Sequence, residues 1–155
     1  MNSPLKPIFE IVYHWTEGSV PPPYHYEYSI KIQEDRTGVV TYRPDYDLED
    51  VPVWHRYFNI PQELYSRLDD LLRSEGFYNY TWTQEIEINV GGSQEWCDGI
   101  IENHEFHIPS GLNREDADKA GSLYSIIKQL GPEEMWEDLE QMRKEYMTRF
   151  FQGKS

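Results

Sequence analysis

The chain has 155 residues, of which 15% are aromatic and 38% hydrophobic, so rings must supply much of the core of what we expect to be one domain spanning residues 1–155. Its net charge of −14, with Lys and Arg scattered rather than clustered, argues against binding to nucleic acid or to an anionic membrane surface. A single cysteine excludes an intrachain disulfide and a zinc site built from several thiolates, and the absence of an apolar leader or a long apolar run predicts a soluble, cytoplasmic protein.

Alternating patterns predict strands in the N-terminal third of the chain. Residues 8–15 and 24–33 place apolar or aromatic side chains at every second position, which is the period of a strand with one buried face. A composition typical of strands resumes at residues 39–43, after a turn in which Gly38 can take a positive φ, so we expect a hairpin. Between the first two strands, residues 18–23 contain three prolines without N–H donors and predict a stiff loop outside the sheet.

One helix and one further strand are predicted in the middle of the chain. Residues 44–52 are acidic and have no clear period, and we interpret them as a surface loop. A leucine stripe over residues 61–75, with a proline in the first turn and Gly76 at the end, predicts a helix. Residues 80–90 alternate again and predict a strand, which the glycine pair at 91–92 ends.

A second hairpin is predicted from residues 95–101 and 104–108. Glu102–Asn103 supplies its turn in one register. Asp98–Gly99 is an equally good turn signal and would shift the strand pairing. The sequence leaves these two registers open.

The C-terminal third is predicted to be helical. Asn113 is a good N-cap for a helix over residues 114–130, which Gly131–Pro132 interrupts before a second helix over residues 133–150. Strands grouped together, rather than alternating one by one with helices, favour an antiparallel sheet. We therefore expect an α+β fold with about five to six strands and about three helices packed on one face of the sheet.

Cys97, the only cysteine, is either a nucleophile or a buried strand residue. The reactive form is the thiolate, and the acids Glu95 and Asp98 would disfavour it by raising the pKa of the thiol. In the first of the two registers, Cys97 and Trp96 point to opposite faces of the sheet. The sequence favours a structural cysteine, and it leaves as an alternative a small hydrolase that uses Cys97, or His104 with Asp98.

Neither a metal site nor a cofactor site is predicted. His104 and His107 would share one face of a helix, but on the predicted strand they point in opposite directions and cannot chelate one ion. The glycine pair at 91–92 lacks the Lys-Ser/Thr of a P-loop, and no GxGxxG motif occurs, so nothing indicates a nucleotide site. We predict no catalytic residue, no metal and no cofactor.

Aromatic residues near proline-stiffened loops are the main indication of function. Rings held on stiff loops offer contact area at a small entropic cost, which suits the recognition of a protein. Core packing is the alternative role for several of these rings. The predicted binding residues are Trp15, Pro22, Tyr24, Tyr46 and Trp54. We expect a non-catalytic binding or regulatory module whose partner has a basic surface, and the sequence leaves the oligomeric state open.

The order of short motifs resembles small, largely uncharacterised bacterial domains. The motifs are Val40-Thr41-Tyr42 in a strand, Glu75-Gly76-Phe77 closing a leucine-rich helix, and Val90 to Ser93 before a final hairpin. The chain is also similar to emfourin-type protein inhibitors of metalloproteases, with Thr16 to Ser19 in place of their Arg-Ser-Gly-Gly opening. This resemblance implies that the loop from Gly18 to Tyr24 inhibits a protease.

Overall fold

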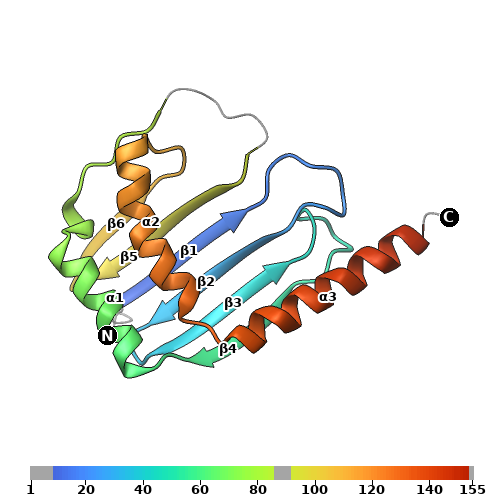
Figure 1. Cartoon of the computed structure of the whole chain (residues 1–155), viewed down its shortest axis with the longest axis horizontal. Helices are drawn as coiled ribbons and strands as arrows, with labels where there is room; N and C mark the ends of the chain where they lie inside the picture. Colours follow the sequence, from blue (N-terminus) through green and yellow to red (C-terminus); the bar gives the residue numbers. More distant parts are fainter. Residues whose placement is uncertain (1–8, 86–91, 154–155) are drawn as a thin grey trace, which may run out of the picture.

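A computed structural model describes residues 9–85 and 92–153, and the architecture is α+β, as the sequence predicts. Six strands form one antiparallel sheet in the order β4-β3-β2-β1-β5-β6 (Figure 1). In chain order the described elements are β1 (Phe9–Thr16), β2 (Glu27–Gln33), β3 (Thr37–Arg43), β4 (Trp54–Asn59), α1 (Gln62–Ser74), a short 3-10 helix (Phe77–Asn79), β5 (Gln94–Ile101), β6 (His104–Ile108), α2 (Arg114–Gln129) and α3 (Glu133–Gln152).

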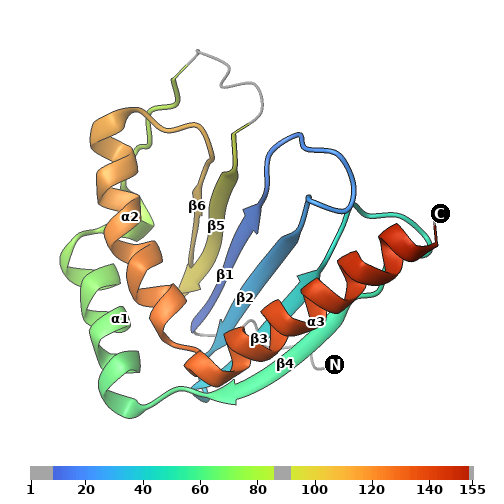
Figure 2. The same cartoon turned by 45° about the vertical axis from the view of Figure 1, so that its right-hand side comes forward.

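The three α-helices lie on one face of the sheet, which confirms the predicted layers (Figures 1 and 2). Every second residue of the strands points to this face and packs against the helices. Tyr13 of β1 lies against Tyr124 of α2 with ring centroids 4.8 Å apart, and Tyr28 of β2 meets Trp136 of α3 at 5.2 Å. The core lies between these two layers, and no described helix covers the other face, which we call the open face.

Strand β4 was not predicted, because its sequence hides the strand period. Trp54 and Phe58 face the helices, but Arg56 lies between them on the same side and donates to the Met142 sulfur of α3 at 2.9 Å. Tyr57 points to the open face and is 77% exposed. A charge on the inner side and a ring on the outer side remove the usual alternation, and a charge that points inward is typical of edge strands.

The strand predicted at residues 80–90 is wrong over its described part, residues 80–85. This segment pairs with the chain just before α2, through hydrogen bonds from Asn113 N to Thr83 O at 2.9 Å and from Glu85 N to Gly111 O at 2.8 Å. Its only sheet-like pairing among the described residues is a single bridge. The rest of the predicted strand, from residue 86 to residue 90, and the first glycine at 91 lie outside the described residues.

The turns correct one prediction and decide another. Arg36, not Gly38, takes the positive φ of 66° in the β2–β3 hairpin, and Gly38 lies inside β3. Glu102 and Asn103 have φ values of 46° and 72°, so the first of the two registers is the one observed. The predicted N-cap is confirmed, because the Asn113 side chain accepts a hydrogen bond from Asp116 N at 2.8 Å.

Candidate functional site

The structure separates the five predicted binding residues into two groups. Trp15 and Trp54 are half-buried on the helix-covered face, where Trp15 lies against Tyr26 and Tyr28 and Trp54 lies against Tyr42. Tyr46 is also half-buried. Pro22 and Tyr24 are exposed, Tyr24 to 49%. The five residues therefore do not form one surface.

Hydrogen bonds hold the proline-rich segment 18–24 to the chain on either side of it. Nδ1 of the buried His25 lies 3.2 Å from the Gly18 carbonyl oxygen, and the imidazole is nearly parallel to the Tyr46 ring, with centroids 3.8 Å apart. The Tyr46 hydroxyl donates to the carbonyl oxygen of Val20 at 2.5 Å. These contacts fix both the start and the middle of the segment, so its backbone is ordered in the free protein.

Helix α3 holds the end of this segment and also the start of the β3–β4 loop. Arg143 donates from its guanidinium to the Tyr24 carbonyl oxygen at 3.4 Å. The Tyr146 hydroxyl donates to the buried carboxylate of Asp45 at 2.8 Å, and burial together with this hydrogen bond raises the pKa of Tyr146 to about 12. Because the phenol keeps its proton at neutral pH, this contact remains in place there.

A small apolar surface is exposed where segment 18–24 lies beside α3, and we call it the loop-end surface. It consists of Pro22, Tyr24 and Phe151 of α3, whose ring centroid lies 6.1 Å from that of Tyr24. Phe151 is 49% exposed, like Tyr24. The β3–β4 loop also reaches this end of the molecule (Figures 1 and 2). Its exposed acids are Asp47, Glu49 and Asp50.

A cleft of about 400 Å³ opens between α2, α3 and the helix-covered face of the sheet, and we call it the aromatic cleft. Tyr42 of β3 lies nearly parallel to two neighbours, Tyr26 at 5.8 Å and 17° and Tyr28 at 6.1 Å and 5°. Trp136 closes one side edge-on to Tyr28, at an interplanar angle of 66°. The residues that line the cleft are Tyr26, Tyr28, Tyr42, Lys128, Trp136 and Glu140.

The aromatic cleft explains where two of the predicted binding residues belong. Trp15 lies 5.4 Å from Tyr28 and Trp54 lies 5.8 Å from Tyr42, so these tryptophans extend the row of rings in the cleft at its two ends. Sequence reasoning missed Lys128 as part of this site. No local signal marks it, because it reaches the cleft from α2, far along the chain.

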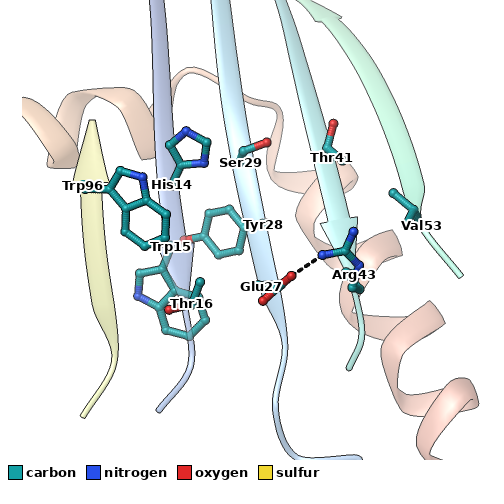
Figure 3. Close-up of a pocket in the computed structure, with 10 residues that line it drawn as sticks. All are labelled: His14, Trp15, Thr16, Glu27, Tyr28, Ser29, Thr41, Arg43, Val53 and Trp96. Atoms are coloured by element: carbon teal, nitrogen blue, oxygen red, sulfur yellow. Dashed lines mark hydrogen bonds and ion pairs between the residues drawn. The ribbon is translucent and has the colours of Figure 1, made fainter. Parts of the chain in front are cut away.

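The open face has a hollow of about 320 Å³ over β1, β2 and β3 (Figure 3). Strand register places His14, Ser29 and Thr41 in one row across the sheet. The two short hydroxyl side chains leave a depression, with His14 and Trp96 on one side and Arg43 on the other. The rings of His14 and Trp96 are nearly parallel, with centroids 5.0 Å apart and an angle of 12°.

Polar groups around this hollow already have partners. Arg43 forms an ion pair with Glu27, and the Thr41 hydroxyl lies 3.2 Å from Nδ1 of His55. Burial lowers the pKa of His14, which favours the neutral imidazole. A ligand would have to displace these internal contacts, so the hollow offers less to a ligand than the aromatic cleft does.

The two catalytic alternatives do not assemble. Cys97 is fully buried on the helix-covered face, opposite to Trp96, and burial raises the pKa of its thiol, so the thiolate is disfavoured. Asp98 lies on the open face, where its carboxylate is 2.6 Å from Nδ1 of His107. His104 lies on the other face of the hairpin, so a pair of Asp98 and His104 is wrong.

Within residues 9–85 and 92–153, no three His, Cys, Asp or Glu side chains come together in a way that could hold a metal ion. In the same ranges, no helix has both the length and the apolar character needed to cross a membrane. The sequence matches no protein-family model and no curated protein. The resemblance to emfourin-type inhibitors therefore stays a prediction.

Proposed function

We propose that this protein is a non-catalytic binding module that recognises a protein partner through the loop-end surface. The observation that carries the proposal is the exposure of Tyr24 and Phe151, each to 49%, beside a segment whose backbone is held by internal hydrogen bonds. A rigid segment loses little conformational entropy when it binds, so more of the contact energy remains as affinity.

The chemistry of the loop-end surface indicates the kind of partner. Tyrosine and phenylalanine rings supply apolar contact area, and tyrosine adds a hydroxyl that can donate at the rim. The acidic residues of the β3–β4 loop and the net charge of −14 favour a partner whose apolar contact is flanked by Lys or Arg. The charges would mainly raise the association rate, and the rings would carry the affinity.

A protease is one partner that this surface could take. The loop from Gly18 to Tyr24 exposes Pro21 and Pro22 on a fixed backbone, and a preformed loop is the feature that reduces the entropic cost of inhibition. This alternative predicts stoichiometric inhibition of a metalloprotease, lost when Tyr24 is replaced. Binding without inhibition would support the binding-module proposal and rule out the inhibitor alternative.

The test uses the intact protein and two variants. The protein captures partners from a lysate, and each captured partner is purified and its Kd measured by calorimetry. We expect the variant Tyr24→Ser/Phe151→Ser to bind at least tenfold more weakly, as two buried interface rings predict. Tyr57→Ser is the matched control, because Tyr57 is 77% exposed on β4 but points to the open face.

The two variants distinguish the outcomes. If the double variant has the same Kd as the intact protein, the loop-end surface is not the binding site. The same conclusion follows if Tyr57→Ser raises the Kd as much as the double variant does. Circular dichroism of both variants checks that the fold is retained.

A further inference from the structure

Aromatic rings form a floor and one wall in the aromatic cleft. Tyr26, Tyr28 and Tyr42 provide nearly parallel rings over about 400 Å³ of open space, and Trp136 stands against Tyr28 at 66°. A volume of this size lies in the range of small-molecule sites, which are mostly apolar with a few placed polar groups. The shape suits one planar ring system laid against the tyrosines.

Lys128 and the tyrosine phenols supply hydrogen-bond donors around these rings. Lys128 lines the cleft with a cation that has three N–H donors, and its ion-pair partner among the described residues is Glu95 at 3.6 Å. Burial raises the pKa of Tyr28 to about 12 and also raises that of Tyr42, so both phenols keep a proton to donate.

Two further donors close to the cleft are buried without partners among the described residues. These are the indole N–H of Trp136, a residue that lines the cleft, and Nε of Arg143, whose guanidinium lies 4.1 Å from the Tyr26 ring. The carboxylate in the lining is Glu140, which lies 3.5 Å from Arg143. Buried donors without acceptors cost free energy, so the polar groups behind the cleft rings are not fully satisfied within the described residues.

A cationic ligand fits this arrangement poorly. The Arg143 guanidinium already lies over the face of Tyr26, and the Lys128 ammonium lies 5.5 Å from the centroid of the Tyr13 ring. One protein cation therefore already occupies the face of a cleft ring, and together with Lys128, which lines the cleft, it would repel an organic cation there. The same two cations attract a carboxylate, although the whole chain carries a net charge of −14.

We propose that the aromatic cleft binds a small planar aromatic carboxylate, of one or two fused rings, with its rings against Tyr28 and Tyr42 and its carboxylate on Lys128. This site is separate from the loop-end surface and does not depend on any protein partner. The carboxylate takes the N–H donors of Lys128 that Glu95 leaves free.

The test titrates the purified full chain with four probes by NMR and calorimetry. The probes are 2-naphthoate, the neutral 2-naphthamide, the non-aromatic cyclohexanecarboxylate and a naphthyl trimethylammonium cation. We expect 2-naphthoate to bind saturably at millimolar concentration or below and to shift the indole N–H signal of Trp136. The other three probes lack either the carboxylate or the ring, and each should bind at least tenfold more weakly.

Two lysine variants test whether the carboxylate of the ligand binds at Lys128. Lys128→Gln should weaken 2-naphthoate about tenfold and leave 2-naphthamide unchanged, because a charge-assisted hydrogen bond is lost. Lys144→Gln, an exposed lysine on α3 outside the cleft, is the matched control and should change neither. The proposal is overturned if no probe saturates, if the cation binds as tightly as 2-naphthoate, or if the two variants behave alike.

Discussion

Phenylalanine rings cover glycines at both edges of the sheet. A Cβ added to Gly38 would lie 2.2 Å from the ring of Phe58 on β4, and one added to Gly99 would lie 2.2 Å from the ring of Phe106 on β6. Because Phe58 is buried, the ring has to leave a packed position to make room. We expect Gly38→Ala to lower the free energy of unfolding by about 1–3 kcal/mol, measured by urea denaturation.

A glycine in open space provides the control for this prediction. Nothing lies within 4 Å of a Cβ added to Gly121 of α2, so Gly121→Ala should stabilise the protein by about 0.5–1 kcal/mol. Gly38→Ala combined with Phe58→Leu should cost less than the sum of the two single variants, because the smaller side chain relieves the overlap. If the effects of the two substitutions on the free energy of unfolding were fully additive, the overlap with the Phe58 ring would not be the cause of the loss in Gly38→Ala.

At the scale of elements, the sequence predicts those whose side-chain period agrees with their tertiary contacts. β1 and all three helices show such a period, and they lie close to where the sequence places them. The strand predicted at residues 24–33 is β2 only from Glu27, because Tyr24 still belongs to the proline-rich segment, whose turn it closes by donating from its backbone N–H to the Pro21 carbonyl oxygen. β4 was missed because Arg56 takes an inner position. Residues 80–85 alternate like a strand, but the carboxylate of Asp116 accepts hydrogen bonds from the Tyr80 hydroxyl and from Thr83 N, and it holds the segment to α2. Such long-range polar contacts leave no local pattern.

The start of α2 depends on one side chain. The side-chain Oδ1 of Asn113 accepts from Asp116 N at 2.8 Å, and the backbone N–H of Asn113 donates to Thr83 O. Asn113→Ala should lower the free energy of unfolding by about 1 kcal/mol, since the N-cap acceptor is lost and the backbone contact stays. Asn113→Ser retains a capping oxygen and should recover most of this loss. An equal loss in both variants would place the effect outside the cap.

At the scale of the whole molecule, the candidate site joins residues that the sequence keeps far apart. The sequence predicts Trp15, Tyr24 and Tyr46 as binding residues because rings cluster near the proline-rich loop, and of these three only Tyr24 is exposed. The sequence could not show which rings face solvent, since that depends on α3 crossing the sheet and packing against rings such as Tyr26 and Tyr28. Lys128 joins the aromatic cleft through helix packing alone. Whether a ring is exposed, and whether a residue lines the cleft, depends on how the helices pack on the sheet.

Buried phenols make the fold sensitive to alkali. Tyr13, Tyr42 and Tyr124 are almost fully buried, and burial is the main cause that raises the pKa of each, with a hydrogen bond to Glu95 adding to the shift of Tyr13. In the unfolded chain a phenol ionises near pH 10, whereas in the folded protein these phenols keep their protons. Their stabilising contribution is therefore complete below about pH 10 and falls as the pH rises further.

Each of these phenols should lower the free energy of unfolding by about 1.4 kcal/mol per pH unit above about pH 10. With about 5–15 kcal/mol available in a typical domain, three such groups should unfold the protein within about one to four pH units. A titration followed by phenolate absorbance and far-ultraviolet circular dichroism, in added salt that screens the net negative charge, should show the last phenols ionising together with loss of the fold. Ionisation of all 12 tyrosines in a protein that keeps its dichroism would contradict this account of the aromatic core.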